Sequence, residues 1–294
     1  MVNLSIIIVS YNSKDVLDKC LKSLQKSTLK NFETIVVDNA SKDNPKDLVK
    51  KYNGVVFIRN DKNLGFSKAN NIGIKIAKGN YILFLNPDME VYPNTLFYML
   101  EFMEKNKDVG AATCKVVLKT GKMDDSCHRG FPTPWNSFCH FSGLTKLFPK
   151  SKLFAGYNLG FLDLSKKHEI DSLAGSFFFA RGNAGKEVGW WDEDFFFYGE
   201  DLDFCYELKQ KGWKIYYVPD VLALHYKGVS GGIKNISKDI STADLETKKR
   251  ATKERFRAME IFYNKHYKNK YSGILTWMVL STIKIKYWLS LRSL

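Results

Sequence analysis

The chain has 294 residues, of which 45% are hydrophobic and 26% charged, a composition that excludes disorder over most of its length and allows one large domain with an appendage. Its formal net charge of +14 favours anionic partners, among them nucleic acid, anionic lipid and diphosphates, without selecting one of them. The five cysteines are dispersed without a Cys-x-x-Cys pair, which argues against a zinc site or a disulfide framework and favours a reducing cytosol.

Strand and helix patterns alternate over the first hundred residues. A β-branched run at 4–9 predicts a strand buried on both faces rather than an export signal, and apolar residues at helical spacing over 15–27 predict the next helix. A second buried strand at 33–37 ends at Asp38 and completes a βαβ unit. Further predicted elements are strands at 55–58 and 81–85 and helices at 67–77 and 94–105. The alternation predicts an α/β, Rossmann-like fold with a mostly parallel central sheet flanked by helices.

The second half of the chain has weaker periodicity. From Gly110 onward the pattern loosens, and residues 121–167 are expected to be rich in loops. The elements predicted after this segment are strands at 172–180, 215–218 and 221–225 and helices at 199–212 and 243–267. We therefore expect one domain over 1–240, followed by a helical and basic extension over 241–294.

The last segment, 272–291, is apolar but is interrupted by Lys284 and Lys286. Its uninterrupted part is shorter than the ~20 residues of a membrane span. An interfacial helix, with Trp277, Tyr287 and Trp288 at the depth of the lipid headgroups, is one expectation. A helix packed on the core or on a second subunit, as in a homodimer, is the alternative, and both remain open.

Polar side chains gather at the predicted carboxyl ends of three strands, where ligands collect in doubly wound sheets. The three strand ends carry Tyr11 and Asn12, then Asp38 and Asn39, then Asn86 and Asp88. Each alone is explained by helix capping, for which Asn12, Ser13, Ser41 and Asn94 are candidates. No glycine-rich phosphate loop follows the first strand, so a carboxylate such as Asp88 is a candidate ligand for a Mg²⁺ or Mn²⁺ ion that would bridge phosphates.

Residues 190–203 mix six carboxylates with six aromatic side chains. Aromatic faces commonly line sugar-binding pockets, and a carboxylate beside them can act as a general base. Glu200, Asp201 and Asp203 also lie in the first turn of a predicted helix, where the helix dipole by itself favours negative charge. His225 ends a predicted strand, and a single histidine is more often structural than a ligand.

The motifs taken in order resemble those of glycosyltransferase family 2, in its rhamnosyltransferase-like branch. They are IIVSYN at 7–12, VVDNAS at 36–41, NLGF at 63–66 with NNIG at 70–73, LNPD at 85–88, and FYGEDLD at 197–203 with HYKGVS at 225–230. The resemblance covers about residues 4–230. It implies the GT-A fold, with a nucleotide-sugar half at about 1–110 and an acceptor half at about 111–240.

The resemblance also assigns roles on the donor side. Tyr11 and Asp38 would meet the base and ribose of a nucleoside diphosphate sugar. Asp88 corresponds to the metal-binding carboxylate of the family's Asp-x-Asp motif, in which Asn86 here replaces the first Asp, and His225 would complete the site for Mg²⁺ or Mn²⁺. The other residues expected to help hold the donor are Asn12, Asn39, Gly65 and Asn70.

On the acceptor side, the resemblance makes Asp201, in the Glu200–Asp201 pair, the base that deprotonates the acceptor hydroxyl. Trp190, Trp191 and Asp203 would lie near the acceptor. Two segments depart from the family pattern, Arg181 to Ala184 and Trp190–Trp191, and both are expected on this side.

The resulting hypothesis is an inverting, metal-dependent glycosyltransferase that uses dTDP-rhamnose or a UDP-sugar and a glycan or lipid-linked acceptor in polysaccharide or glycolipid biosynthesis. We expect it in the cytoplasm, peripheral at the inner face of the cell membrane through 272–294. A nucleotidyltransferase is disfavoured because its glycine-rich loop is missing after the first strand. The alternatives are a catalytically inactive sugar-binding relative and a nucleic-acid-binding protein, although no nucleic-acid partner is expected because no recognition motif occurs.

Overall fold

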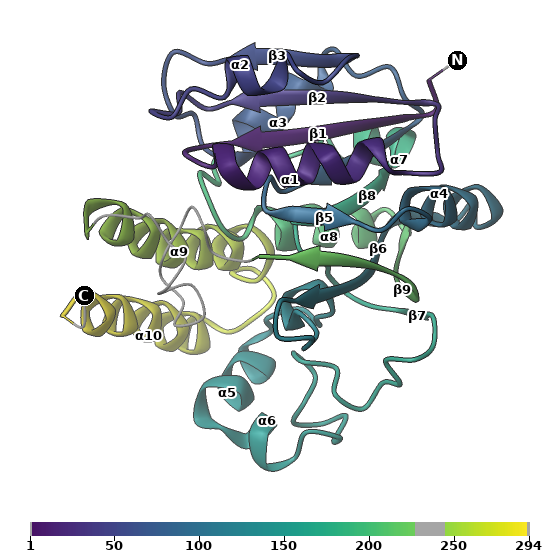
Figure 1. Cartoon of the computed structure of the whole chain (residues 1–294). Helices are drawn as coiled ribbons and strands as arrows, with labels where there is room; N and C mark the ends of the chain where they lie inside the picture. Colours follow the sequence, from purple (N-terminus) through teal and green to yellow (C-terminus); the bar gives the residue numbers. More distant parts are fainter. Residues whose placement is uncertain (1, 227–244, 293–294) are drawn as a thin grey trace.

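The computed structural model of the chain describes residues 2–226 and 245–292, and within them nine strands form one mixed sheet (Figure 1). Its first half is parallel, in the order β3-β2-β1-β4. These strands span Leu4–Ser10 (β1), Phe32–Asp38 (β2), Val55–Arg59 (β3) and Tyr81–Leu85 (β4). The helices of this half are α1 (Lys14–Gln25), α2 (Lys46–Val49), α3 (Phe66–Ile74) and α4 (Thr95–Lys105). The predicted parallel half is confirmed.

The second half of the sheet is mixed, in the order β8-β6-β9-β5, with β7 also paired to β9. Strand β8 runs antiparallel to both β4 and β6, whereas β6 and β9 are parallel. The strands are β5 (Met89–Val91), β6 (Val109–Leu118), β7 (His168–Glu169), β8 (Phe177–Arg181) and β9 (Lys214–His225). The helices are η1 (Asp125–Cys127), α5 (Pro134–Ser142), α6 (Leu144–Leu147), α7 (Gly182–Glu187) and α8 (Glu200–Gln210).

Several predicted boundaries in this half were wrong. Strand β6 was not predicted. Strand β9 is one strand rather than two, with its pairing register to β6 broken between Cys114 and Lys115, and β8 begins at Phe177 instead of 172. The segment expected to be loops contains α5, which starts with Pro134 behind a capping bond from Thr133 and ends at left-handed Gly143.

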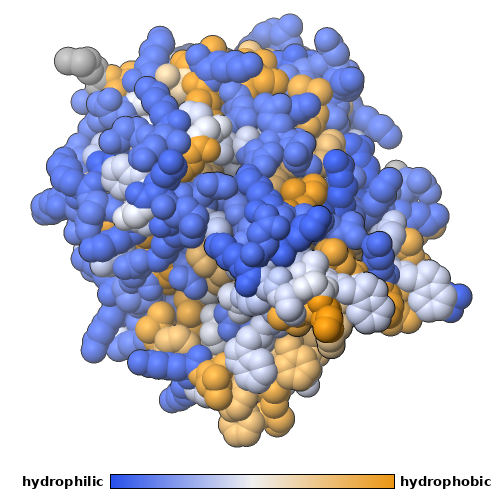
Figure 2. Space-filling model, turned by 180° about the vertical axis from the view of Figure 1, so that it is seen from behind, coloured by the Kyte–Doolittle hydropathy of each residue, from blue (hydrophilic) through white to orange (hydrophobic). Residues whose placement is uncertain are grey.

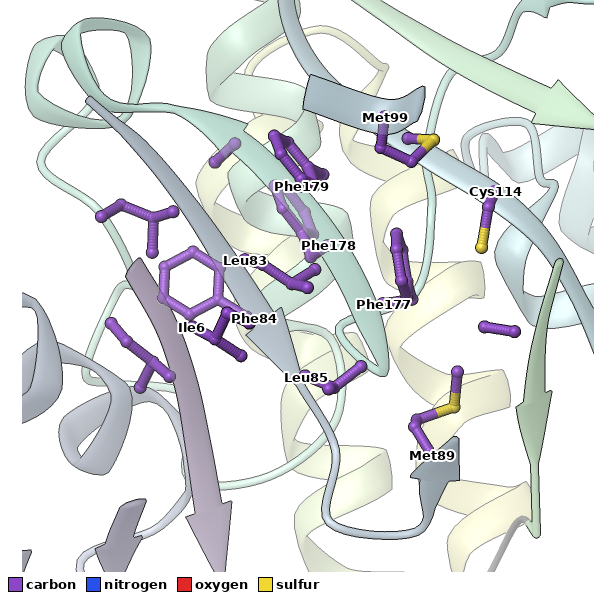
Figure 3. Packing of buried hydrophobic residues seen from close by; sticks show 14 of the residues in the cluster. Ile6, Leu83, Phe84, Leu85, Met89, Met99, Cys114, Phe177, Phe178 and Phe179 are labelled. Atoms are coloured by element: carbon purple, nitrogen blue, oxygen red, sulfur yellow. The ribbon is translucent and has the colours of Figure 1, made fainter. Parts of the chain in front are cut away.

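Aromatic side chains fill the layer between the sheet and α8. Figure 3 shows Phe177, Phe178 and Phe179 of β8 between β4 and the strand that carries Cys114. The ring of Phe178 stacks on Phe204 of α8 at 4.9 Å. This contact fixes α8 beneath the sheet, so the start of α8 lies at a defined place.

The C-terminal part consists of α9 (Leu245–His266) and α10 (Gly273–Arg292). Helix α9 packs on α8 through a second small core that includes Tyr206 and Phe262. Helix α10 packs on α9, with the Tyr263 hydroxyl 3.2 Å from Thr276 and the rings of Phe256 and Tyr287 in contact. Across 2–226 and 245–292, none of the helices has the length and apolar character that crossing a bilayer requires.

Candidate active site

The loops after β1 and β2 are joined at the carboxyl edge of the sheet. The backbone N–H of Asn12 donates to the Ser41 hydroxyl at 2.9 Å, and the Asn12 side chain accepts from the N–H of Lys42 at 2.8 Å. Asp38 is fully buried and forms a 2.8 Å ion pair with Arg59. Tyr11 is half-buried at the same edge. Tyr11, Asn12 and Asp38 therefore lie together at this edge of the sheet.

Ser13 and Asn94 do not cap helices with their side chains, which was the alternative explanation for polar residues in these loops. Both precede helices, α1 and α4, but neither side chain makes a capping hydrogen bond. The Ser13 hydroxyl instead pairs with that of Ser10 at 3.0 Å.

Asn39 organises the loop that follows β3. Its amide nitrogen donates to the Asn63 side chain and to the Gly65 carbonyl, and its oxygen accepts from the Asn60 side chain and the Leu64 N–H, all at 3.0 Å. These four bonds use the capacity of the amide, so the structure gives Asn39 a supporting position rather than the predicted donor contact. Asn70 is also buried and donates to the carbonyl of Phe66.

Gly65 lets this loop approach the segment before α8. Its φ of +85° lies in the left-handed region, and a Cβ there would lie 2.5 Å from the carbonyl oxygen of Phe196. The next N–H, of Phe66, donates to that same carbonyl at 2.8 Å. The loop after β3 is thus attached directly to the segment that leads into Glu200.

Asp88 and His225 are brought together, as the resemblance implied. Met89 of β5 pairs with His225 of β9, which places the imidazole Nε2 3.4 Å from an Asp88 oxygen. The other ring nitrogen, Nδ1, is 2.8 Å from a carboxylate oxygen of buried Asp124. Burial alone would lower the pKa of His225, but Asp88 and Asp124 outweigh it and raise that pKa to about 9.

This donor set fits a divalent cation once Nε2 of His225 gives up its proton, which a cation bound beside Asp88 would displace. A metal-bound histidine usually presents one ring nitrogen to the ion while a carboxylate holds the other, and Asp124 occupies that second position. Asn86 lies in the same turn, where its N–H and carbonyl make backbone bonds to Ser176 and Met89. Sequence reasoning missed Asp124, whose only local signal is the Asp-x-Ser turn in which it accepts from Ser126.

A second acidic group lies between α8 and α9. Asp203, Glu207 and His266 are close enough to surround a cation. The ammonium of Lys265, however, lies 2.9 Å from Asp203 and 3.6 Å from Glu207, and His266 Nε2 is 2.6 Å from Asp203. The structure therefore uses Asp203 to bind α9 to α8 and does not place it at the predicted acceptor position.

Glu200 and Asp201 begin α8 directly after left-handed Gly199. One Asp201 oxygen accepts from Arg129 at 2.8 Å and from the Gly175 N–H at 3.3 Å, which orients the carboxylate. Burial, and then the charge of Asp201, raise the pKa of Glu200 to about 8, so Glu200 holds a proton at neutral pH. Of the two, Asp201 is the one placed to accept a proton.

Arg129 was missed by sequence reasoning, because it lies in the segment expected to be loops. Its side chain is 13% exposed and that of Asp201 is 14% exposed, so the pair is largely shielded from water but is still accessible. The nitrogen that binds Asp201 also donates to the carbonyl of Leu173 at 3.1 Å, which holds the guanidinium in place.

Trp191 is buried in the hydrophobic core, and Trp190 is half-buried and packs against that core. Trp191 is 1% exposed, with its ring centroid 4.8 Å from that of Phe84 and 4.9 Å from that of Phe204. Trp190 packs over Gly185, where a Cβ would lie 2.2 Å from its ring. The structure places these tryptophans in the hydrophobic layer, which differs from the expected acceptor role because covering β4 requires large apolar groups there.

Arg181 lies at the far end of the sheet from these carboxylates. It pairs in register with Tyr81, the first residue of β4, whereas the candidate site follows the last one. Arg181 is buried and donates to the carbonyls of Met103, Asn106 and Val109. The departure from the family pattern at 181 is therefore structural.

Comparison with known families identifies the sequence pattern. Residues 5–163 match the model described as Glycosyl transferase family 2, and residues 152–238 match Glycosyl transferase family group 2. The chain is 28% identical over 230 residues to rhamnosyltransferase WbbL of Escherichia coli K12, covering 75% of this chain and 82% of the relative. It is 27% identical over 241 residues to N-acetylglucosaminyl-diphospho-decaprenol L-rhamnosyltransferase of Mycobacterium tuberculosis, covering 78% of each.

Solved structures share the fold. GalNAc-T7 with UDP, GalNAc and Mn²⁺ superimposes with a TM-score of 0.59 at 18% identity, covering 86% of this chain and 48% of that one. Staphylococcus aureus TarS 1–349 in complex with UDP-GlcNAc gives 0.53 at 18% identity, covering 86% and 66%. This chain thus spans about half of GalNAc-T7, and at such identities the likeness shows the GT-A fold alone.

Proposed function

The chain belongs to glycosyl transferase family 2, and from that membership we propose that it moves one sugar from a nucleoside diphosphate sugar to a glycan or lipid-linked acceptor. The family and the mixed α/β, GT-A fold confirm what the motifs predicted, and the chain is a glycosyltransferase. The observation that carries the proposal is the position of Asp201 at the start of α8, a carboxylate that Arg129 and the Gly175 N–H orient. The names of the two rhamnosyltransferase relatives favour dTDP-rhamnose as donor over a UDP-sugar.

In the proposed reaction, Asp201 accepts the proton of the acceptor hydroxyl. The oxygen forms a bond to the anomeric carbon from the face opposite the diphosphate, the bond from that carbon to the diphosphate oxygen breaks, and the configuration inverts. Arg129 and the Gly175 N–H keep the Asp201 carboxylate aimed during this step. Glu200, being neutral, adds no second negative charge near the acceptor.

The donor's diphosphate needs a countercharge, since no glycine-rich loop supplies one. Asp88 and His225 would hold a Mg²⁺ or Mn²⁺ ion, with Asp124 fixing the imidazole. Such an ion supplies electrostatic stabilisation of the leaving diphosphate. Tyr11, Asn12 and Asp38 would border the nucleoside at the adjoining edge of the sheet, and Asn39, Gly65 and Asn70 would support that edge from the loop behind it.

The proposed location is the cytoplasm, peripheral at the inner face of the cell membrane. A lipid-linked acceptor is supported by the Mycobacterium relative, whose name specifies a diphospho-decaprenol substrate. The exposed apolar side of α10 supports peripheral contact with lipid.

The test is calorimetric titration of the purified protein with UDP, dTDP, GDP and ADP, each with Mn²⁺ and again with excess chelator. We expect one pyrimidine diphosphate to bind and chelator to abolish its binding. If none binds under any condition, the inactive-relative alternative replaces the proposal. Nucleotide binding that is unchanged by chelator would contradict the metal-binding role of Asp88 and His225 but would leave the proposed glycosyl transfer standing.

A further inference from the structure

Two segments far apart in the sequence expose large apolar side chains. In the α5–α6 hairpin, residues 134–153, Phe138 is 56% exposed and Leu147 72%. In α10, Trp277 is 69% exposed and Ile285 59%. No residue of α10 is buried, although its other side packs on α9. A helix that is apolar on its uncovered side requires a partner.

The two segments form one surface. The ammonium of Lys286 on α10 lies 3.9 Å from the ring centroid of Phe141 on α5. Figure 1 places α5, α6 and α10 at the same end of the molecule, and Figure 2 shows hydrophobic and aromatic groups gathered along that lower edge beneath a mostly hydrophilic body. We call the exposed side of 134–153 and of α10 the docking face.

The formal charges within the two segments of the docking face have one sign. Residues 126–162 and 261–294 contain no Asp or Glu. The cations within the hairpin and α10 are Lys146, Lys150, Lys152, Lys284, Lys286 and Arg292. Apolar side chains framed by cations complement an anionic bilayer, where rings enter the acyl boundary and lysine stems extend to the headgroups. A second copy of the chain fits less well, because protein interfaces are depleted in lysine and a copy would bring the same positive charge.

We propose that the α5–α6 hairpin and α10 together dock the protein on an anionic membrane, with the hairpin as an inserting element in its own right. The hairpin also joins this face to the site, since only residues 130–133 separate Arg129, which contacts Asp201, from the start of α5. Docking would then bring the headgroup of a lipid-linked acceptor toward Asp201, a consequence that rests on the proposed function, whereas the docking itself does not.

The experiment is co-sedimentation with phosphatidylcholine vesicles with and without phosphatidylglycerol. The hairpin variant is Phe138→Asp/Leu147→Asp, and the helix variant is Trp277→Asp/Ile285→Asp. The matched control, Phe97→Asp/Ile76→Asp, makes the same kind of change at exposed apolar positions outside the docking face. Because all six side chains are exposed, unchanged thermal unfolding is expected for every variant.

We expect binding to the anionic vesicles only, with each docking variant losing at least about tenfold in partition coefficient and the control losing none. Equal binding of the hairpin variant and the wild type would overturn the proposal. So would a hairpin variant that changes the oligomeric state by light scattering but not vesicle binding, since the face would then be a subunit interface. Titration with nucleotide in the absence of vesicles separates failure of the docking proposal from failure of the proposed function. The docking variants change no residue of the proposed donor site, so their nucleotide affinity should equal that of the wild type.

Discussion

Asp124 offers the sharpest test of the candidate metal site. Its Oδ2 is 2.8 Å from Nδ1 of His225, and its Oδ1 accepts from both the N–H and the hydroxyl of Ser126. In Asp124→Asn the side-chain amide offers one acceptor oxygen, whereas the wild-type carboxylate uses both of its oxygens. If the amide nitrogen faces the histidine it opposes the ring N–H, and if it faces Ser126 the turn loses its acceptor. Either orientation disturbs the imidazole that is to hold the ion.

Loss of such a partner of a metal-bound histidine typically costs about 10–100-fold in metal affinity, which is about 1.4–2.7 kcal/mol. Asp124 is fully buried and His225 is 6% exposed, so water cannot readily replace the lost bond, and we expect the upper half of that range. The assay is titration with Mn²⁺ followed by electron paramagnetic resonance, and then nucleotide titration at saturating Mn²⁺, where much of the loss should be recovered.

Asp163→Asn is the matched control. Asp163 forms the same Asp-x-Ser turn, accepting from the N–H and hydroxyl of Ser165 at 3.0 and 2.7 Å, but it does not hydrogen-bond to His225. It should leave Mn²⁺ affinity unchanged. The reasoning is refuted if Asp124→Asn binds Mn²⁺ as the wild type does, or if both variants lose affinity equally.

Three further outcomes follow from the site and its support. Asp201→Asn should retain nucleotide binding in calorimetry and lose transfer, and wild-type turnover would exclude Asp201 as the base. Glu200→Gln should flatten the pH dependence of stability. Between the ordinary glutamate pKa near 4.5 and about 8, folded wild type holds a proton on Glu200 that the unfolded chain releases, so the free energy of unfolding of the wild type falls as pH rises while that of the variant does not. Parallel curves of unfolding free energy from pH 5 to 8 would contradict the raised pKa of Glu200. Arg181→Met removes the guanidinium donor from the buried carbonyls of Met103 and Val109, whereas the Asn106 carbonyl keeps its bond from the Val109 N–H. The variant should cost about 2 kcal/mol or more in urea unfolding, and a loss under about 1 kcal/mol would show that those two carbonyls find other partners.

The sequence predicted the donor half well because its signals are local. Continuous β-branched runs specify strands buried on both faces, and helical spacing between them specifies the crossovers, so the parallel order of β1 to β4 and the common edge of Tyr11, Asp38 and Asp88 follow. The described elements confirm α9 and α10 as helices, but the motif residues 227–230 and the predicted helix start at 243 lie outside the described part of the chain.

Only the tertiary structure decided which distant groups complete the site. Arg129 reaches Asp201 across 72 residues and Asp124 reaches His225 across 101, both from a segment without periodicity. Side chains of the carboxylate-rich, aromatic segment 190–203 lie in three different places. Asp201 pairs with Arg129 at the candidate site, Asp203 binds α9, and Trp191 is buried in the core. Residues one or two positions apart on a helix point in different directions, and the groups that each contacts come from segments distant in the sequence. The composition at 190–203 therefore indicated a functional segment, but only the tertiary structure showed which of its side chains lie at the site.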